Sequence, residues 1–273
     1  MTFAGFQNPF ANLMSEQNPN QPQGQPISLQ AISQEFMLGL QRHFDVLAYN
    51  IAAHDSVSTA TYDTVSASTR IMPFAHAHAN HEQVQAFMQD LMVRNALNDA
   101  MGISAACMDN CYLLCQLIKN QGLGQTNAAE ATKLVNEARQ AFARMPFDQR
   151  FECFEKEFGI ICELEDALIS FGFALQALVQ NNGVLTKEIC DDSDHLDLEF
   201  KMLQVSPSAK DASKPEARLV TATKTYKVGD RIDLSKQELL SIPVTLAALF
   251  QNIFVGVDKY AKATLPAAPK TEA

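Results

Sequence analysis

Three histidines lie close together in the first third of the chain and could hold a metal ion. They are His76, His78 and His81, in the segment FAHAHANHE. Neutral imidazole is a good ligand for zinc, copper or nickel, and alternate residues of an extended segment point to one face. No Glu-x-x-His or His-Glu-x-x-His pattern supplies further ligands. The cluster therefore predicts either a divalent metal site or a group of solvated histidines, and no other cofactor is predicted.

Three of the six cysteines, Cys107, Cys111 and Cys115, are spaced by four residues. Neighbours in this series share one face of a helix and could chelate a metal as a pair. The first and the last lie about 12 Å apart along the axis, so one ion cannot take all three from a straight helix. Cysteine also behaves as a small apolar residue. We expect these three side chains to line a tight helix interface.

A polar patch centred on an arginine interrupts the apolar pattern nearby. It consists of Arg94, Asn95, Asn98 and Asp99. In one interpretation Asp90 and Arg94 form an ion pair one helical turn apart, while the asparagines satisfy buried polar groups. In the other, the patch is a binding or catalytic site.

The second interpretation is based on a resemblance. The segment from Arg94 to Asp99 resembles the Arg-Asn/His-x4-His signature of the HEPN superfamily, whose members are helical bundles that often dimerise and include ribonucleases and toxin-like proteins. The resemblance covers about six residues. It implies that Arg94 contacts phosphate. The histidine of the signature is absent, since residues 98–101 are Asn, Asp, Ala and Met.

The patch and the cysteines lie on one predicted helix over residues 80–121. Apolar residues return there every three or four positions without a proline, which is the pattern of an amphipathic helix. Asn80 and Gln83 have the spacing of a capping box. Gly102 predicts a kink or a close helix crossing.

Four further helices are predicted from apolar periodicity and caps. They cover 28–53, 127–144, 148–180 (also very long) and 235–262, the last interrupted at Pro243. The Ser/Thr/Ala-rich segment 54–79 lacks helical periodicity. We expect a loop there, with short extended pieces around residues 60–65.

A β segment separates the fourth helix from the last. Residues 195–205 alternate apolar and polar side chains, and 219–228 are rich in Thr and Val. The Gly229-Asp230 pair predicts a turn into a return strand at 231–234. About forty residues make a poor core alone. We therefore expect a small antiparallel insertion at about 195–234.

The predicted fold class is mainly α. It is an up-and-down bundle of about five helices, two of them very long, with the β insertion before the last helix. A single domain should cover 27–264. Residues 1–26 are rich in Asn, Gln and Pro with one charge, which predicts a disordered tail. In an alternative, Phe3, Phe6 and Phe10 dock on a neighbouring surface. Residues 265–273 are predicted to be a flexible tail.

Composition limits the partners. A net charge of −10 argues against binding to a nucleic-acid backbone. The longest apolar stretch, 242–257, contains Gln251 and Asn252, so we expect no membrane span. The N-terminal residues lack the pattern of a secretory signal. Six cysteines without such a signal favour reduced thiols in the cytoplasm.

The sequence has no phosphate-binding glycine loop and no serine nucleophile elbow. We therefore expect a non-enzymatic binding or scaffold protein that acts through protein or ligand interactions. Long apolar-striped helices bury more surface when paired, which predicts a homo-oligomer, in its simplest form a dimer. The alternatives are a HEPN-like ribonuclease or toxin-related protein, and a metal-binding protein of the histidine cluster.

Overall fold

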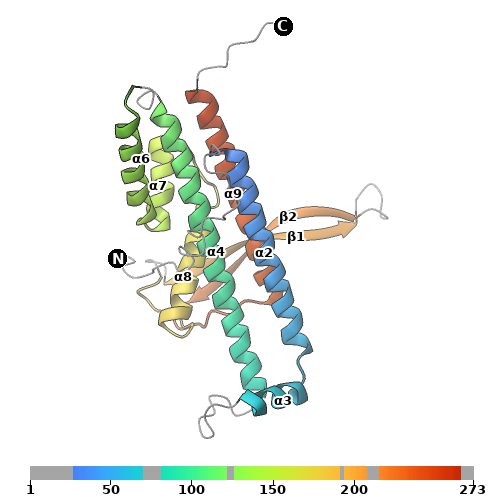
Figure 1. The fold of residues 1–273 in the computed structure, drawn as a ribbon. Coiled ribbons are helices and arrows are strands. Elements are labelled where there is room, and N and C mark those ends of the chain that lie inside the picture. Colours follow the sequence, from blue (N-terminus) through green and yellow to red (C-terminus); the bar gives the residue numbers. More distant parts are fainter. Residues whose placement is uncertain (1–26, 70–80, 122–125, 191–193, 208–214, 266–273) are drawn as a thin grey trace. The chain divides into compact units, whose positions relative to one another are not determined.

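A computed structural model of the chain describes residues 27–69, 81–121, 126–190, 194–207 and 215–265. These residues form seven helices and one two-stranded antiparallel sheet that precedes the last helix (Figure 1). The helices are α2 (Leu29–Ser56), α3 (Thr59–Thr69), α4 (His81–Lys119), α6 (Ala128–Ala143), α7 (Phe147–Phe158), α8 (Glu165–Gln180) and α9 (Lys236–Thr264). The protein is mainly α with a small β insertion, as predicted.

The predicted long helix over 148–180 is wrong, because the structure divides it into α7 and α8. Gly159 ends α7 in the left-handed conformation, with φ of +67°. Its N–H and that of Ile160 donate to carbonyls of the last turn of α7, which satisfies groups that a helix end leaves free. The apolar spacing continues across the break, so periodicity alone could not locate it.

The predicted loop over 54–79 contains a helix. Residues Thr59–Thr69 form α3, where short extended pieces were expected. Ser58 begins it, since its side chain accepts a hydrogen bond from the Thr61 N–H at 3.2 Å. Serine and threonine are favoured at such N-terminal positions. Small polar residues thus support a helix here without an apolar stripe.

The β insertion pairs differently from the prediction. Strand β1 (His195–Pro207) pairs with β2 (Pro215–Lys227), with His195 opposite Lys227 and Pro207 opposite Pro215. The turn at Gly229, with φ of +92°, does form. The chain after it makes only an isolated bridge from Arg231 to Val184. The return strand at 231–234 is therefore wrong.

Helix α9 continues through Pro243. Ser235 and Glu238 cap its start, because each accepts a hydrogen bond from the other's backbone N–H, at 3.2 and 2.7 Å. A proline inside a helix costs roughly 3 kcal/mol. Ile242 and Leu246 on either side are fully buried, and their burial offsets that cost.

Helices α4 and α9 are long and apolar enough to cross a membrane by length and composition. Their most apolar windows have mean hydropathies of 1.2 and 1.8, and 50% and 56% of the window residues are buried inside the structure. Core helices of soluble proteins pass the same test. The absence of a membrane span therefore stays a prediction.

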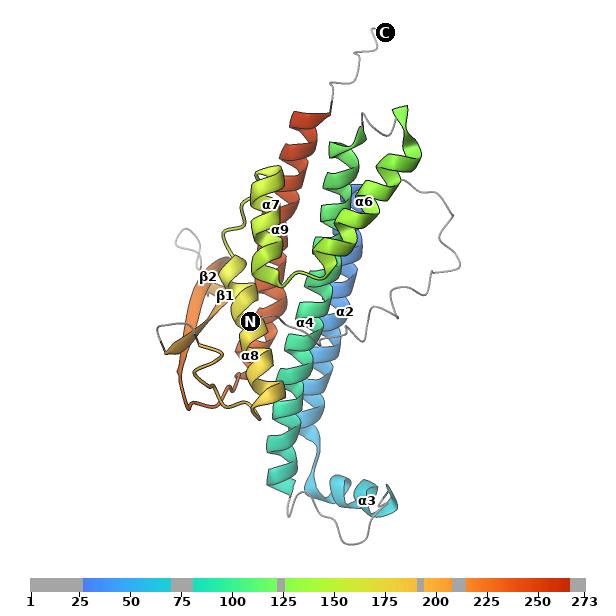
Figure 2. The same cartoon turned by 90° about the vertical axis from the view of Figure 1, so that its left-hand side faces the viewer.

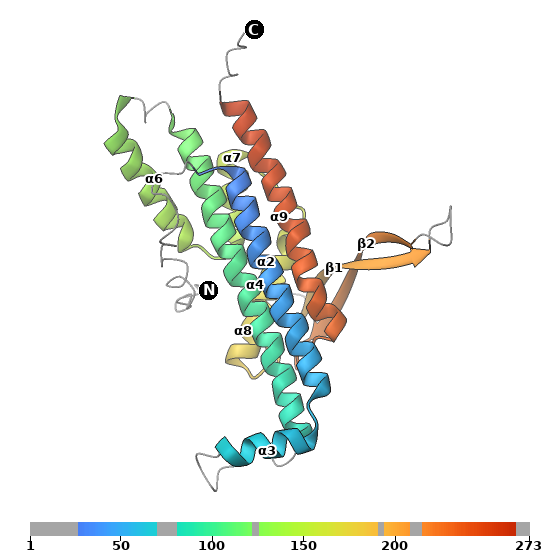
Figure 3. The ribbon, with the colours of Figure 1, turned by 45° about the vertical axis from the view of Figure 1, so that its right-hand side comes forward.

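The described residues group into two compact units, and the single domain over 27–264 stays a prediction. The first unit contains the described residues up to Leu40, 101–169 and those from Thr245. Its core is an aromatic cluster in which Tyr112 stacks on Phe142 at 4.0 Å and Phe158 meets Tyr260 at 5.1 Å. At one side α2 lies along α9, with Phe36 against Phe250 (Figure 3).

The second unit contains residues 41–100 and 170–244 where they are described. One face of the β hairpin is buried in it through Leu196, Leu198 and Phe200. Phe200 contacts Phe171 of α8, with ring centroids 5.5 Å apart. The end of α2 and the start of α4 belong to this unit, and the polar patch lies on this part of α4.

Candidate functional site

Helix α4 positions the predicted polar patch. Met92, Val93, Ala96 and Leu97 are buried and fix the orientation of this part of the helix. Residues four apart share a face, so Asp90, Arg94 and Asn98 form one row. Asn95 is exposed, and Asp99 lies on an adjacent face beside α2. The four predicted residues thus divide between two faces.

Asp90 is the centre of the first row. Arg94 donates to its carboxylate at 3.3 Å, which confirms the predicted ion pair one turn apart. Arg231, from the segment after β2, reaches the same oxygen at 3.0 Å. The Nε of Arg94 is buried without a hydrogen-bond partner among the described residues. Two guanidinium groups around one carboxylate leave a local charge of +1.

Asp99 faces a buried histidine on α2. Its Oδ2 lies 3.7 Å from Nδ1 of His43, whose side chain is only 3% exposed. The other ring nitrogen, Nε2, is buried and has no hydrogen-bond partner in the described part of the chain. At 3.7 Å the contact between His43 and Asp99 is too long for a hydrogen bond.

His81 lies far from this patch. Arg94 lies thirteen positions further along α4, which is roughly 20 Å along the helix axis. It contacts α3 instead, with Nδ1 at 3.3 Å from the Thr59 hydroxyl and its ring at 5.6 Å from that of Tyr62. His76 and His78 lie outside the described residues. The histidine cluster as a whole therefore stays a prediction.

A second histidine, His54, lies near the same end of α4. Its Nε2 is 3.2 Å from the carbonyl of Gln85, and its Nδ1 is 3.3 Å from Asp55. The hydrogen bond from the Lys236 ammonium lowers the pKa of Asp55. Among the described residues, no group of three or more His, Cys, Asp or Glu side chains is placed to hold a metal ion.

The three cysteines of α4 are buried, and none of them forms a disulfide. Burial raises the pKa of Cys115 to about 12 and that of Cys107 far above its ordinary value. A thiol with a raised pKa is a poor nucleophile and a poor metal ligand at neutral pH. These properties agree with the packing interpretation.

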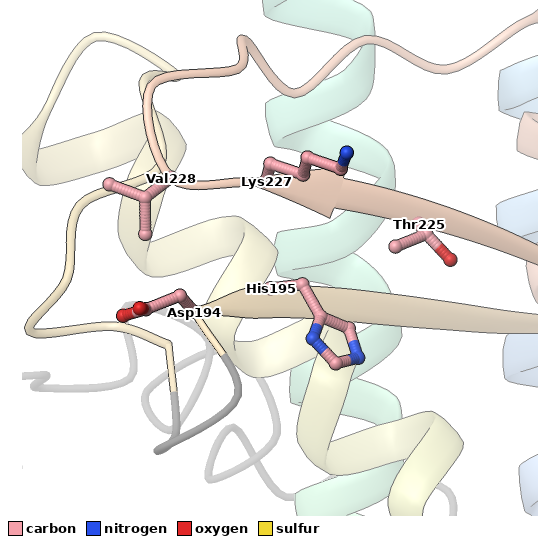
Figure 4. A pocket seen from close by; sticks show the side chains of 5 residues that line it. All are labelled: Asp194, His195, Thr225, Lys227 and Val228. Carbon is pink, nitrogen blue, oxygen red and sulfur yellow. The ribbon is translucent and has the colours of Figure 1, made fainter.

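An open depression lies at the base of the β hairpin (Figure 4). Its volume is about 460 Å³, and it is lined by Asp194, His195, Thr225, Lys227 and Val228. The side chains of Asp194, His195 and Lys227 point in three different directions (Figure 4). His195 lies 3.5 Å from Asp197 on its own strand. This depression lacks the convergent polar groups that catalysis needs.

Sequence reasoning missed two polar centres. Arg231 joins Asp90 from 141 positions away in the chain, and no local pattern could indicate that contact. Arg150, 8% exposed, lies between the rings of Phe142 and Phe147 and bonds Asp109 at 3.1 Å. An arginine within an apolar helix face was the available signal for the second.

Fold and site together define a mainly α protein with a cluster of two arginines around one carboxylate. No protein-family model, curated protein or solved structure matches the chain.

Proposed function

We propose that the protein is a non-enzymatic binding or scaffold protein that acts as a homo-oligomer, most simply a dimer, in the cytoplasm. The observation that supports this proposal is a poorly covered part of the second unit, made of segments of three helices. We call it the arm and define it as the described residues 48–69 and 81–91. It contains the end of α2, all of α3 and the start of α4 (Figure 3).

The arm carries large apolar side chains that are poorly buried. Its side chains are all half-buried or exposed where their burial is described. Tyr49 of α2 is 75% exposed and Met88 of α4 is 44% exposed. Completing the burial of one such side chain stabilises a structure by up to ~1.5–3 kcal/mol. A second copy of the arm would supply that cover, because two helical hairpins can pair into a four-helix bundle.

The charges of the arm favour the same partner. Only four of its 33 residues are charged, whereas charged residues make up 19% of the chain. Two of the four, Asp55 and Asp90, are already paired with Lys236 and with arginines. Cores of protein–protein interfaces are depleted of charge in the same way. Two arms can therefore approach each other without strong repulsion.

The test is the molar mass of the full chain by light scattering at tens of micromolar. Tyr49→Glu and Met88→Glu each place a charge in the proposed interface, and we expect either to reduce a dimer to a monomer. Leu38→Glu is the matched control, since Leu38 is 66% exposed on α2 outside the arm. Circular dichroism checks that each variant is folded. A monomeric parent, or variants that stay dimeric, would refute the proposal.

The alternative, a HEPN-like RNA-cleaving protein, has one supporting observation. Arg94 and Arg231 both lie at Asp90, and the Arg94 side chain is 31% exposed. A pair of guanidinium groups is suited to contact phosphate. RNA incubated with the parent, Arg94→Ala and His76→Ala separates the two functions. Cleavage lost in the variants would favour the alternative, and an inactive parent would eliminate it.

A further inference from the structure

Residues of α4 and α6 in the first unit line a groove. The two helices lie side by side (Figure 2). Its volume is about 400 Å³. Leu113 and Leu117 of α4 form one wall, and Ala131 and Val135 of α6 form the other. None of the ten described residues that line it is charged. Ligand sites that take apolar groups have similar volumes and linings.

The groove is incompletely covered at its apolar positions. Leu117 is 42% exposed, while Val135 on the opposite wall is 4% exposed. The stack of Tyr112 on Phe142 holds the far end of α6 against α4. The shape is therefore set by packing outside the groove itself, and an occupant need not create it.

Ile27 lines the same groove, and it is the first residue that the structure describes. The 26 residues before it continue the chain from this place. They contain one charged residue, Glu16, together with Phe3, Phe6 and Phe10. An almost uncharged segment with apolar side chains thus ends at an open groove whose lining is uncharged and mostly apolar.

We propose that the chain's own N-terminal segment occupies this groove through Phe3, Phe6 and Phe10. Seventeen positions separate Phe10 from Ile27, and a chain of that length reaches at most about 60 Å. The chain is therefore long enough for the rings of Phe3, Phe6 and Phe10 to reach the groove. The tether gives the segment a local concentration of the order of millimolar, so a weak contact is sufficient. The segment would then exclude other apolar partners from the groove. This proposal is independent of the arm.

The absence of tryptophan from the chain allows a clean test. In the full chain, Phe6→Trp introduces a single tryptophan whose emission reports its surroundings. We expect emission at shorter wavelength than that of free tryptophan, and several-fold weaker quenching by acrylamide. Leu117→Lys and Thr132→Lys charge opposite walls of the groove, and each should shift the emission back and restore quenching.

Leu134→Lys is the matched control, because Leu134 is 43% exposed on α6 and does not line the groove. It should leave the emission unchanged, and circular dichroism should show equal helix content in all variants. Solvent-like emission in the Phe6→Trp protein would overturn the proposal. So would a shifted emission that neither groove variant changes, since the segment would then bind elsewhere. A shift lost on dilution would assign the groove to a second copy and refute the own-chain occupant.

Discussion

Replacing Gly256 with alanine probes a close contact between α9 and the segment after α7. A Cβ atom at position 256 would lie 2.5 Å from Cγ2 of Ile160 and 3.3 Å from its Cβ. Ile160 is 3% exposed, and its backbone N–H is bonded to Phe154. Its β-branched side chain has few rotamers with which to escape. The contact therefore requires a shift of packed atoms.

Two opposing effects set the magnitude. Overpacking a core typically costs ~1–3 kcal/mol, whereas alanine is favoured over glycine inside a helix by roughly 0.5–1 kcal/mol. We expect Gly256→Ala to lower the free energy of unfolding by about 1–2 kcal/mol. Gly102→Ala is the control, because no described atom lies within 4 Å of a Cβ built there. It should stabilise by about 0.5–1 kcal/mol. The open space around that Cβ position also shows that the predicted close helix crossing at Gly102 is wrong.

Urea unfolding followed by circular dichroism measures both variants. A double-mutant cycle with Ile160→Ala identifies the source of the cost, because contacting residues are not additive. In that background Gly256→Ala should become neutral or stabilising. The reasoning would be refuted if Gly256→Ala stabilised the parent as Gly102→Ala does, or if its cost were unchanged without the Ile160 side chain.

Two further predictions concern the first unit. Arg150→Met leaves Asp109 and the carbonyls of Ala143 and Met145 without their donor. Arg150→Met should lower the free energy of unfolding, measured in urea, by ~3–5 kcal/mol. Arg150→Lys should restore little of that stability, because lysine lacks the planar guanidinium fork. A loss below about 1 kcal/mol in Arg150→Met would contradict this prediction. Burial alone would raise the pKa of Glu157, but hydrogen bonds from Lys119 and Tyr112 outweigh it and hold that pKa below the ordinary 4.5. The resulting stability is present above pH 4.5 and is lost as the pH falls through the folded-state pKa. The Glu157→Gln variant should therefore be less stable than the parent at neutral pH, and the two proteins should become equally stable in acid. If their stability–pH curves stayed parallel, the contacts of Glu157 with Lys119 and Tyr112 would contribute nothing to stability.

Local signals in the sequence located most helices but not their interruptions. The capping pairs at Asn127 and Ser235 begin helices as predicted, because a cap acts through residues three positions apart. Gly159 ends α7 although the apolar stripe continues beyond it. The stripe reports which side chains are buried, and a break that preserves the buried face leaves it intact. The left-handed backbone conformation of Gly159 therefore determines where α7 ends.

Pairing over a long range could not be predicted in the same way. The turn at Gly229 was correct, but β2 found β1 as its partner instead of the residues after the turn. A turn signal fixes a reversal of the chain, whereas the partner depends on which strand offers a matching buried face. Leu198 and Phe200 of β1 offer that face. Arg231 reaches Asp90 as a consequence of this arrangement, so the arginine cluster had no sequence signature.

Helix α4 shows what an apolar pattern can and cannot indicate. Its second half buries Met108, Cys111 and Cys115 completely. Its first turns, residues 81–91, have the same periodicity, yet Phe87 and Met88 stay 50% and 44% exposed. Periodicity predicts a face that should be covered, but it does not say whether the same chain or another one covers it. The exposed start of α4 is therefore the surface at which a search for the partner should begin. The most direct measurement compares the molar mass of the Met88→Glu variant in solution with that of the Leu38→Glu variant.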